Sequence, residues 1–195
     1  MIDNSRVYIA LLHYPVYNKT GQVVASAVTN LDLHDLARMT ATFGLGGYYV
    51  VTPLPLQAKL AQRVMDHWLF GPGADSNWTR KEAFERVRVA PDLKQALEEI
   101  KSRGLGTPKL VATTAREIKG QMSFAQFRKM MAEEQGQSFL ILFGTGWGIT
   151  EEFMLSECDR VLEPIRGSAD YNHLSVRTAA AIILDRLFSI DRNKF

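Results

Sequence analysis

Glycines alternate with other residues between Gly144 and Gly148, where the chain reads Gly-Thr-Gly-Trp-Gly. The apolar run just before them, residues 138–143, has the composition of a buried strand. Glycine adopts positive φ without strain and lets the backbone approach a ligand closely, with N–H groups free to point at it. The segment therefore favours a ligand-binding loop at the carboxyl end of a strand. A tight structural turn is the alternative from these residues alone.

The common glycine motifs do not fit this loop. The dinucleotide fingerprint G-x-G-x-x-G fails because Ile149 stands at the third glycine, and the phosphate loop G-x-x-x-x-G-K-[ST] occurs nowhere in the chain. The G-x-G-x-G loop after the first strand of Rossmann-like methyltransferases matches locally. Its position argues against that fold, because the chain ends at Phe195, too soon after Gly148 for the strands and helices that would follow.

Alternating strand and helix patterns must position this loop. Apolar, β-prone runs predict strands at residues 7–12, 48–51, 87–89, 109–113, 138–143 and 160–162. Helical spacing and capping residues predict helices at residues 30–43, 56–68, 93–103, 123–134 and 174–187, with a short acidic helix starting near residue 150. This order predicts an α/β fold with a mostly parallel sheet flanked by helices, in a single domain over residues 1–195.

Three other segments allow two interpretations each. Residues 13–21 form either a substrate lid or a packed surface loop, and residues 71–79 have the composition of a long exposed loop. Residues 80–88 carry Arg80, Lys81, Arg86 and Arg88, which indicate either phosphate contacts or a solvated face.

Composition narrows the setting. The net charge of +2 and the pI of about 8.7 permit nucleic-acid binding without requiring it. No apolar run is long enough for a membrane helix, and no signal-peptide pattern is present. Cys158 is the single cysteine, so it forms no internal disulfide and favours a reducing cytoplasm.

The segment from Pro164 to Leu184 resembles the third motif of the SpoU–TrmD (SPOUT) class of S-adenosylmethionine-dependent RNA methyltransferases. In that motif a strand ends in a turn with proline and glycine, and a loop leads through a polar pair into an Ala-rich helix. Residues 30–44 resemble motif one, and residues 142–149 stand where the glycine loop of motif two is expected. The resemblance covers residues 7–187 in the right order and is closest to a small bacterial single-domain subgroup.

The resemblance implies a deep trefoil knot at roughly residues 109–190, with a bent S-adenosylmethionine held among three of its loops. The implied cofactor-binding residues are Thr113, Thr114, Phe143, Gly144, Thr145, Gly146, Gly148, Leu162, Pro164, Ile165, Gly167, Asn172, His173, Leu174 and Ser175.

The implied catalytic residues are Arg38 and Asn30 of motif one, together with His173. Histidine titrates near neutrality, so His173 is a candidate general base, with loop packing or phosphate contact as the alternative. Arg38 either assists the methyl acceptor or lies on the solvent side of its helix. Arg177 either meets RNA phosphate or pairs with a carboxylate.

This chain departs from the SpoU pattern at three places. The interval from Asn30 to Arg38 is longer, and Gly146 stands near the place of the motif-two glutamate. Asn172 or Ser175 matches the polar residue of motif three, depending on where a gap is placed. The ribose 2′-oxygen and a base nitrogen therefore both remain open as methyl acceptors.

Taken together, the resemblance implies methyl transfer from S-adenosylmethionine to structured RNA, tRNA or rRNA. It implies a cytoplasmic homodimer packed through the apolar helix at residues 174–187, with neither a membrane nor a metal as partner. The alternative is an RNA-binding protein of the same fold that keeps the cofactor pocket and has lost turnover.

Overall fold

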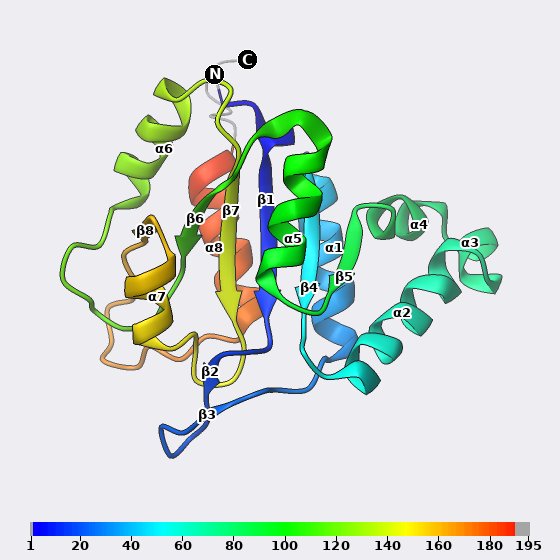
Figure 1. Ribbon diagram of the computed structural model, residues 1–195, viewed down its shortest axis with the longest axis horizontal. Helices are drawn as coiled ribbons and strands as arrows, with labels where there is room; N and C mark the ends of the chain where they lie inside the picture. The colour runs from blue at the N-terminus through cyan, green and yellow to red at the C-terminus, as the bar shows by residue number, and fades with distance from the viewer. Residues whose placement is uncertain (1, 190–195) are drawn as a thin grey trace.

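The computed structural model describes residues 2–189, and it contains one six-stranded parallel sheet (Figure 1). Its strands are β1 (Val7–Leu12), β4 (Gly47–Val51), β5 (Val87–Ala90), β6 (Lys109–Ala112), β7 (Phe139–Gly144) and β8 (Arg160–Val161). They lie in the order β5-β4-β1-β7-β6-β8. A separate antiparallel hairpin joins β2 (Val16–Tyr17) to β3 (Val23–Val24). The predicted α/β fold with a mostly parallel sheet is confirmed. The domain was predicted to span residues 1–195, and of these residues 1 and 190–195 lie outside the described part of the chain.

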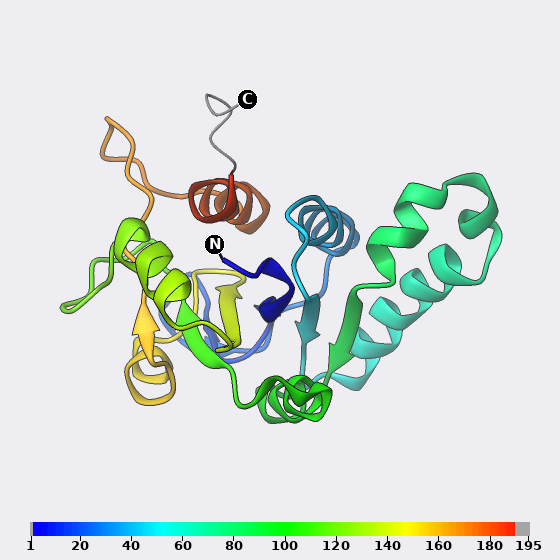
Figure 2. The ribbon, with the colours of Figure 1, turned by 90° about the horizontal axis from the view of Figure 1, so that it is seen from above.

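Helices cover both faces of this sheet (Figure 2). They are α1 (Asn30–Thr42), α2 (Pro55–Leu69), α3 (Pro72–Ser76), α4 (Trp78–Phe84), α5 (Leu93–Ile100), α6 (Phe124–Glu133), α7 (Glu151–Glu157) and α8 (Val176–Phe188), with short helical segments η1 (Asn4–Arg6) and η2 (Lys101–Leu105). One apolar core joins alternate strand residues to α1, α2, α4, α6 and α8. The second core joins the other strand residues to α5 and α7. This division follows from the alternation of side chains along a strand.

The register of the central strands brings their carboxyl ends to one edge. β1 and β7 are parallel neighbours, with Leu12 beside Gly144 and Leu11 beside Phe143. Ala112 of β6 lies beside Leu142 of β7. Because every strand points the same way, the loops after β1, β6, β7 and β8 all emerge at that edge, which is the lower one in Figure 1.

Side-chain caps fix where the helices begin, as their sequences predict. The Thr29 hydroxyl accepts the Asp32 N–H at the start of α1, and Ser123 with Gln126 forms the expected capping box of α6. The Ser175 hydroxyl accepts the Thr178 N–H, so α8 begins at Val176. Residues 174 and 175, expected within this helix, therefore belong to the preceding loop.

The region after α2 corrects two expectations. Residues 71–79 are not a long loop, because α3 occupies Pro72–Ser76 and α4 begins at Trp78, with the Asn77 side chain as its cap. The apolar face of α2 is also not core throughout, since Leu56 is 76% and Leu60 46% exposed. Within residues 2–189 no helix is both long and apolar enough to cross a membrane.

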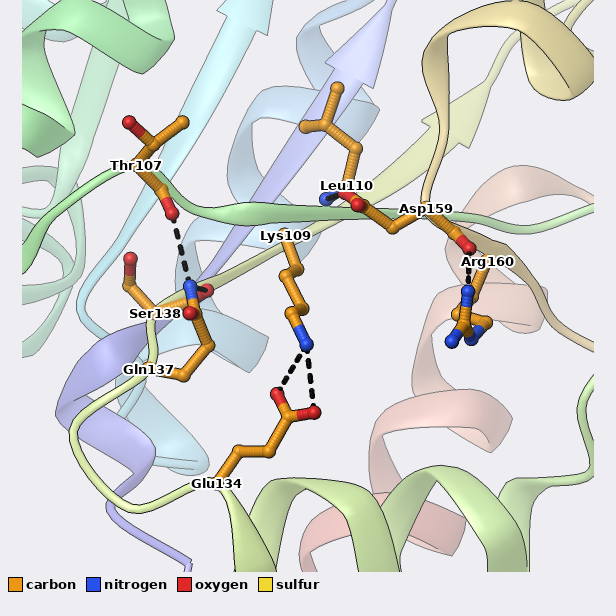
Figure 3. A network of polar contacts seen from close by, with 8 residues as sticks. All are labelled: Thr107, Lys109, Leu110, Glu134, Gln137, Ser138, Asp159 and Arg160. Carbon is orange, nitrogen blue, oxygen red and sulfur yellow. Dashed lines mark hydrogen bonds and ion pairs between the residues drawn. The ribbon is translucent and has the colours of Figure 1, made fainter.

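At the opposite edge of the sheet, a polar network joins the start of β6 to α6 and to the segment before β8 (Figure 3). The Lys109 ammonium contacts both carboxylate oxygens of Glu134 at 2.7 Å. The Leu110 N–H donates to the Asp159 carboxylate at 2.8 Å. These contacts fix the amino ends of β6 and β8 far from the loops at the carboxyl edge.

We expect Lys109→Met to lower the free energy of unfolding by about 0.5–1 kcal/mol, because a two-oxygen ion pair at partly buried side chains is lost. Urea denaturation measures the change. The matched control is Lys129→Met, whose more exposed pair with Glu133 spans 3.7 Å. A loss no greater at Lys109 than at Lys129 would contradict the assignment.

Candidate functional site

A cavity of about 900 Å³ opens at the carboxyl edge of the sheet. Its walls come from the segments that follow β1, β6, β7 and β8, together with the first turns of α1 and α8. Ligand sites in open α/β sheets lie outside the carboxyl ends of the strands, and this cavity has the size of a small-molecule site.

Hydrogen bonds hold the loops around this cavity against one another. Asn172 Nδ2 donates to the Ala115 carbonyl at 2.8 Å, and an Arg116 guanidinium N–H donates to the Ile149 carbonyl. The loop after β7 also pairs with the β2–β3 hairpin, because the Trp147 N–H donates to the Tyr17 carbonyl at 3.0 Å. The loops after β6, β7 and β8 are thereby joined into one wall.

The glycine loop packs closely against its own chain and against the β2–β3 hairpin. A Cβ on Gly144 would lie 2.6 Å from the Ile149 nitrogen, and a Cβ on Gly146 would lie 2.9 Å from the Tyr17 carbonyl oxygen. Gly146 and Gly148 have φ of +58° and +91°, the left-handed region that glycine alone enters without strain. The loop can turn this tightly and pack against the hairpin only because these side chains are absent.

The rest of the lining fits an adenosyl group. Apolar contacts come from Phe143, Ile165 and Ile183, and hydroxyl groups come from Thr113 and Thr114. Thr113 Oγ1 donates to the Leu142 carbonyl at 2.9 Å. A cradle of glycine backbone, apolar side chains and few charges suits a flat base and a ribose, which need close approach and directed hydrogen bonds.

A chain of polar side chains lies at the floor of the cavity. His13, directly after β1, is fully buried, and its Nδ1 lies 3.0 Å from Ser26 Oγ. Ser26 Oγ in turn contacts Thr145 Oγ1, which donates to the Leu12 carbonyl at 3.2 Å. Burial lowers the pKa of His13 to about 4, partly opposed by the charge of Asp32, so this ring is neutral at physiological pH.

Asp32 is a buried carboxylate that lines the same cavity. The Thr29 hydroxyl donates to its Oδ2 at 2.7 Å, and Arg177 Nη1 donates to its Oδ1 at 3.1 Å. Arg177 also pairs with Asp35 at 3.4 Å. Of the two roles considered for Arg177, the structure shows carboxylate pairing, which joins the first turn of α8 to the first turns of α1.

We expect Arg177→Met to lower the free energy of unfolding by about 1–2 kcal/mol, since the Asp32 carboxylate loses its charged donor while staying buried. The methionine keeps the packing of the arginine stem. The measurement is urea denaturation. Asp35→Asn, which removes only the more exposed partner, should cost less, and the reverse order would contradict this account.

Aromatic side chains stand at the mouth of the cavity. The rings of Trp147 and His173 lie edge to face with centroids 5.4 Å apart, and Tyr171 contacts His173 in the same way at 5.5 Å. Trp147 and Tyr171 are 51% and 75% exposed. On the hairpin side, the Arg116 guanidinium lies over the Tyr17 ring at 4.8 Å.

Most of the residues expected to bind a cofactor lie on this lining. They are Thr113, Thr114, Phe143, Gly144, Thr145, Gly146, Gly148, Ile165, Asn172, His173, Leu174 and Ser175. Three expected residues do not line it. Leu162 and Pro164 are buried in the core side of their loop, where the Leu162 N–H continues the ladder to Ala112, and Gly167 is exposed.

The two motif-one residues also lie outside the lining. Asn30 and Arg38 are both exposed on α1, at its first residue and in its third turn. Arg38 therefore lies on the solvent side of its helix, which was one of the two interpretations of this residue. The β2–β3 hairpin, in contrast, covers part of the cavity through Tyr17, Asn18 and Lys19, as a lid would.

Some lining residues were missed from the sequence, chiefly Ser26 and Asp32. Asp32 had a local signal, because it stands in the first turn of a capped helix, but that signal fits any helix start. Cys158 is half-buried away from the cavity, and burial together with Asp159 and Glu157 raises its pKa to about 12, which keeps the thiol protonated and unreactive.

Comparison with known proteins agrees with this geometry. Residues 6–189 match the model of a family described as SAM-dependent RNA methyltransferase. The chain is 45% identical over 181 residues to a tRNA (guanine-N(1)-)-methyltransferase of Oleidesulfovibrio alaskensis, covering 93% of this chain and 41% of that protein. It is 41% identical to an uncharacterized protein of Aquifex aeolicus, covering 97% of this chain and 91% of that one. The chain thus spans less than half the length of the named relative.

Solved structures share the fold at low sequence identity. A putative methylase family protein from Neisseria gonorrhoeae aligns with a TM-score of 0.64 at 17% identity, covering 97% of this chain and 85% of that one. The SpoU methyltransferase AviRb from Streptomyces viridochromogenes, in complex with AdoMet, aligns with a TM-score of 0.56 at 16% identity, over 96% of this chain and 58% of that one. Because the family model matches residues 6–189, nearly the whole of this chain, the chain belongs to the family of SAM-dependent RNA methyltransferases.

Proposed function

We propose that this chain methylates tRNA, with S-adenosylmethionine seated in the cavity at the carboxyl edge of the sheet. The observation that carries the proposal is the cavity itself, which is lined by the segments after β6, β7 and β8 and by the glycines of the loop after β7. The choice of tRNA comes from the named relative, of which this chain matches less than half. The acceptor atom, ribose oxygen or base nitrogen, is left to the experiment below.

The chain's own residues hold and orient the reactants in this proposal. When bound, S-adenosylmethionine supplies a methyl group on a positively charged sulfur. The glycine loop and the hydroxyls of Thr113 and Thr114, which line the cavity, would hold this methyl donor in place for an acceptor. His173, at that mouth between two aromatic rings, takes the proton of the acceptor. Asn30 and Arg38 lie outside the cavity, and we assign them to RNA contact instead.

The SPOUT assignment and the trefoil knot are part of the same proposal. The segment after β8 runs against the segment after β6: Gln121 Nε2 donates to the carbonyls of Arg116 and Leu162, and the Glu163 N–H donates to the Met122 carbonyl. If the segment after β8 passed through the loop of residues 113–124, these contacts between the two segments would follow. The knot would then fix the cofactor loops at roughly residues 109–190.

A homodimer through α8 and α1 also belongs to the proposal. Figure 2 shows these helices side by side on one face of the sheet. α8 buries Ala180, Ile183 and Leu184 within the chain, whereas Ala181 and, on α1, Leu31 stay exposed. A second copy would cover these apolar side chains. We place such a tRNA-modifying dimer in the cytoplasm, as one domain over residues 1–195.

The test uses purified protein, S-adenosylmethionine labelled in the methyl group, and separate pools of bacterial tRNA and rRNA. We expect label in the tRNA pool, and digestion to nucleosides identifies the methylated atom. Label in rRNA alone would overturn the choice of substrate. Calorimetric binding of S-adenosylhomocysteine without transfer to either pool would show an RNA-binding protein that has lost turnover, and would overturn the assigned activity.

A further inference from the structure

The hydrogen bonds that join His13, Ser26 and Thr145 at the cavity floor must all run in one direction, because each hydroxyl has only one proton to donate. The Leu12 carbonyl can only accept, and in one of the two possible arrangements the hydroxyl proton of Thr145 points at it, over 3.2 Å. Thr145 Oγ1 must then accept from Ser26, whose only proton is used in that contact. Ser26 Oγ must in turn accept from His13, and the ring proton of His13 therefore resides on Nδ1, 3.0 Å away.

In the reverse arrangement Thr145 donates to Ser26 and Ser26 donates to Nδ1 of His13, which puts the ring proton on Nε2. That arrangement is less favourable. A Ser26 proton aimed at the His13 carbonyl would span 3.5 Å, the limit of a hydrogen bond. A ring proton on Nε2 would be buried there without an acceptor at hydrogen-bond distance among the described residues. The Ala27 backbone, which raises the pKa of His13, does not reach Nε2 with hydrogen-bond geometry. Orphaned buried N–H groups are rarer than acceptors that lack a donor. The Nδ1–H form leaves only a bare lone pair on Nε2.

This direction sets what the floor offers a ligand. The protons of Ser26 and Thr145 both point into the protein, so each oxygen has only a lone pair left for the cavity that the two residues line. Asp32, on the same lining, is a carboxylate and adds further acceptors. In this part of the site, three side chains accept and none donates.

Resting on the proposed function, we infer that Ser26 and Thr145 form a subsite for an N–H donor and that His13 is the positioning residue that fixes its acceptor polarity. The donor is an amino or amide N–H group. It belongs either to the cofactor, in its adenine or its amino-acid part, or to the nucleobase that is methylated. The neighbouring Asp32 carboxylate favours such a group, because N–H donors carry partial or full positive charge.

Matched substitutions separate polarity from shape. Asparagine at position 13 can place its amide N–H near the position of Nδ1 and keep the donor to Ser26, whereas glutamine reaches toward Nε2 and does not. Thr145→Ser keeps the hydroxyl, and Thr145→Val keeps the shape without it. We expect His13→Gln to bind or react about tenfold more weakly than His13→Asn, and Thr145→Val about tenfold more weakly than Thr145→Ser.

Two assays identify the source of the N–H group. Calorimetry with S-adenosylhomocysteine reports the cofactor, and the KM for bacterial tRNA reports the nucleobase. A tenfold difference within the matched pairs in the first assay assigns the subsite to the cofactor, and one confined to the second assigns it to the RNA. Thermal unfolding of each variant shows that it is folded. Equal behaviour within both pairs in both assays overturns the inference.

A ligand-free measurement keeps the inference distinct from the proposed function. Nitrogen-15 shifts of the histidine rings distinguish Nδ1–H from Nε2–H, and the His13→Asn spectrum identifies which of the four histidines gives each signal. We expect the Nδ1–H form at His13, and an Nε2–H form overturns the relay whatever the protein binds. Failure of the parent protein to bind S-adenosylhomocysteine or methylate RNA would overturn the proposed function instead, while the ring signal would still decide the polarity of the floor.

Discussion

Replacing Gly146 by alanine should lower methyl transfer about a hundredfold. Alanine at φ +58° carries roughly 1–2 kcal/mol of backbone strain, and its Cβ would lie 2.9 Å from the Tyr17 carbonyl oxygen. The loop can relieve this contact only by moving away from the β2–β3 hairpin, which shifts the cradle at the cavity. A loss of about 2.7 kcal/mol of transition-state stabilisation through this displacement corresponds to the hundredfold decrease in rate. Initial rates with labelled S-adenosylmethionine and tRNA measure it.

Gly44 provides the matched control. Its φ is +64°, close to that of Gly146, but a Cβ there would meet nothing within 4 Å. Gly44→Ala should therefore carry the same backbone strain, about 1–2 kcal/mol in the free energy of unfolding, and transfer methyl groups at the parental rate. If both variants transferred at the parental rate, the close approach of the glycine loop would have no part in the reaction.

The sheet was predictable because its strands are buried on both faces. Runs such as residues 7–12 and 138–143 are apolar without alternation, which is the pattern of central parallel strands, and the structure places them side by side. Once strands are parallel, the loops after them must share an edge. The grouping of residues 113–116 and 143–148 around one cavity follows from topology alone.

The floor of the cavity was not predictable in this way. His13 follows β1 in a stretch that reads as a surface loop, yet its ring is fully buried because the linker before α1 folds back over it. Ser26, in that linker, has no sequence neighbour that marks it. Its role arises from contacts with residues 13 and 145, which are distant in the chain. Contacts between residues so distant in the chain produce no periodic pattern in the sequence, so they could not be predicted from it.

The helices α3 and α4 were missed for a different reason, because their boundary residues resemble a loop. Glycine, proline, aspartate and asparagine over residues 71–77 are turn formers, and by composition they indicate a loop. In the structure Pro72 starts α3 and Asn77 caps α4, so the same residues serve as helix boundaries. Composition reports that the chain turns here, and it does not distinguish one long loop from two short helices.

Acid should destabilise the protein through His13. The ring is neutral in the folded protein because burial lowers its pKa from 6.5 to about 4. Between these values the unfolded chain binds the proton and the folded one does not, so falling pH favours unfolding. The difference between the two pKa values corresponds to roughly 3 kcal/mol in the free energy of unfolding. This stability is fully present above pH 6.5 and is lost progressively as the pH falls toward 4. Urea denaturation at several pH values across this range measures the loss.

His13→Asn isolates this effect, because asparagine does not titrate and can keep the hydrogen bond to Ser26. Its free energy of unfolding should vary with pH by about 3 kcal/mol less than that of the parent over the same range. His34 contributes in the same direction, since burial and then the charge of Arg80 lower its pKa. The double variant His13→Asn, His34→Gln measures how much of the remaining pH dependence of the free energy of unfolding comes from His34. An unchanged slope in His13→Asn would mean that His13 is accessible to protons in the folded state, and the closed floor of the cavity would have to be given up.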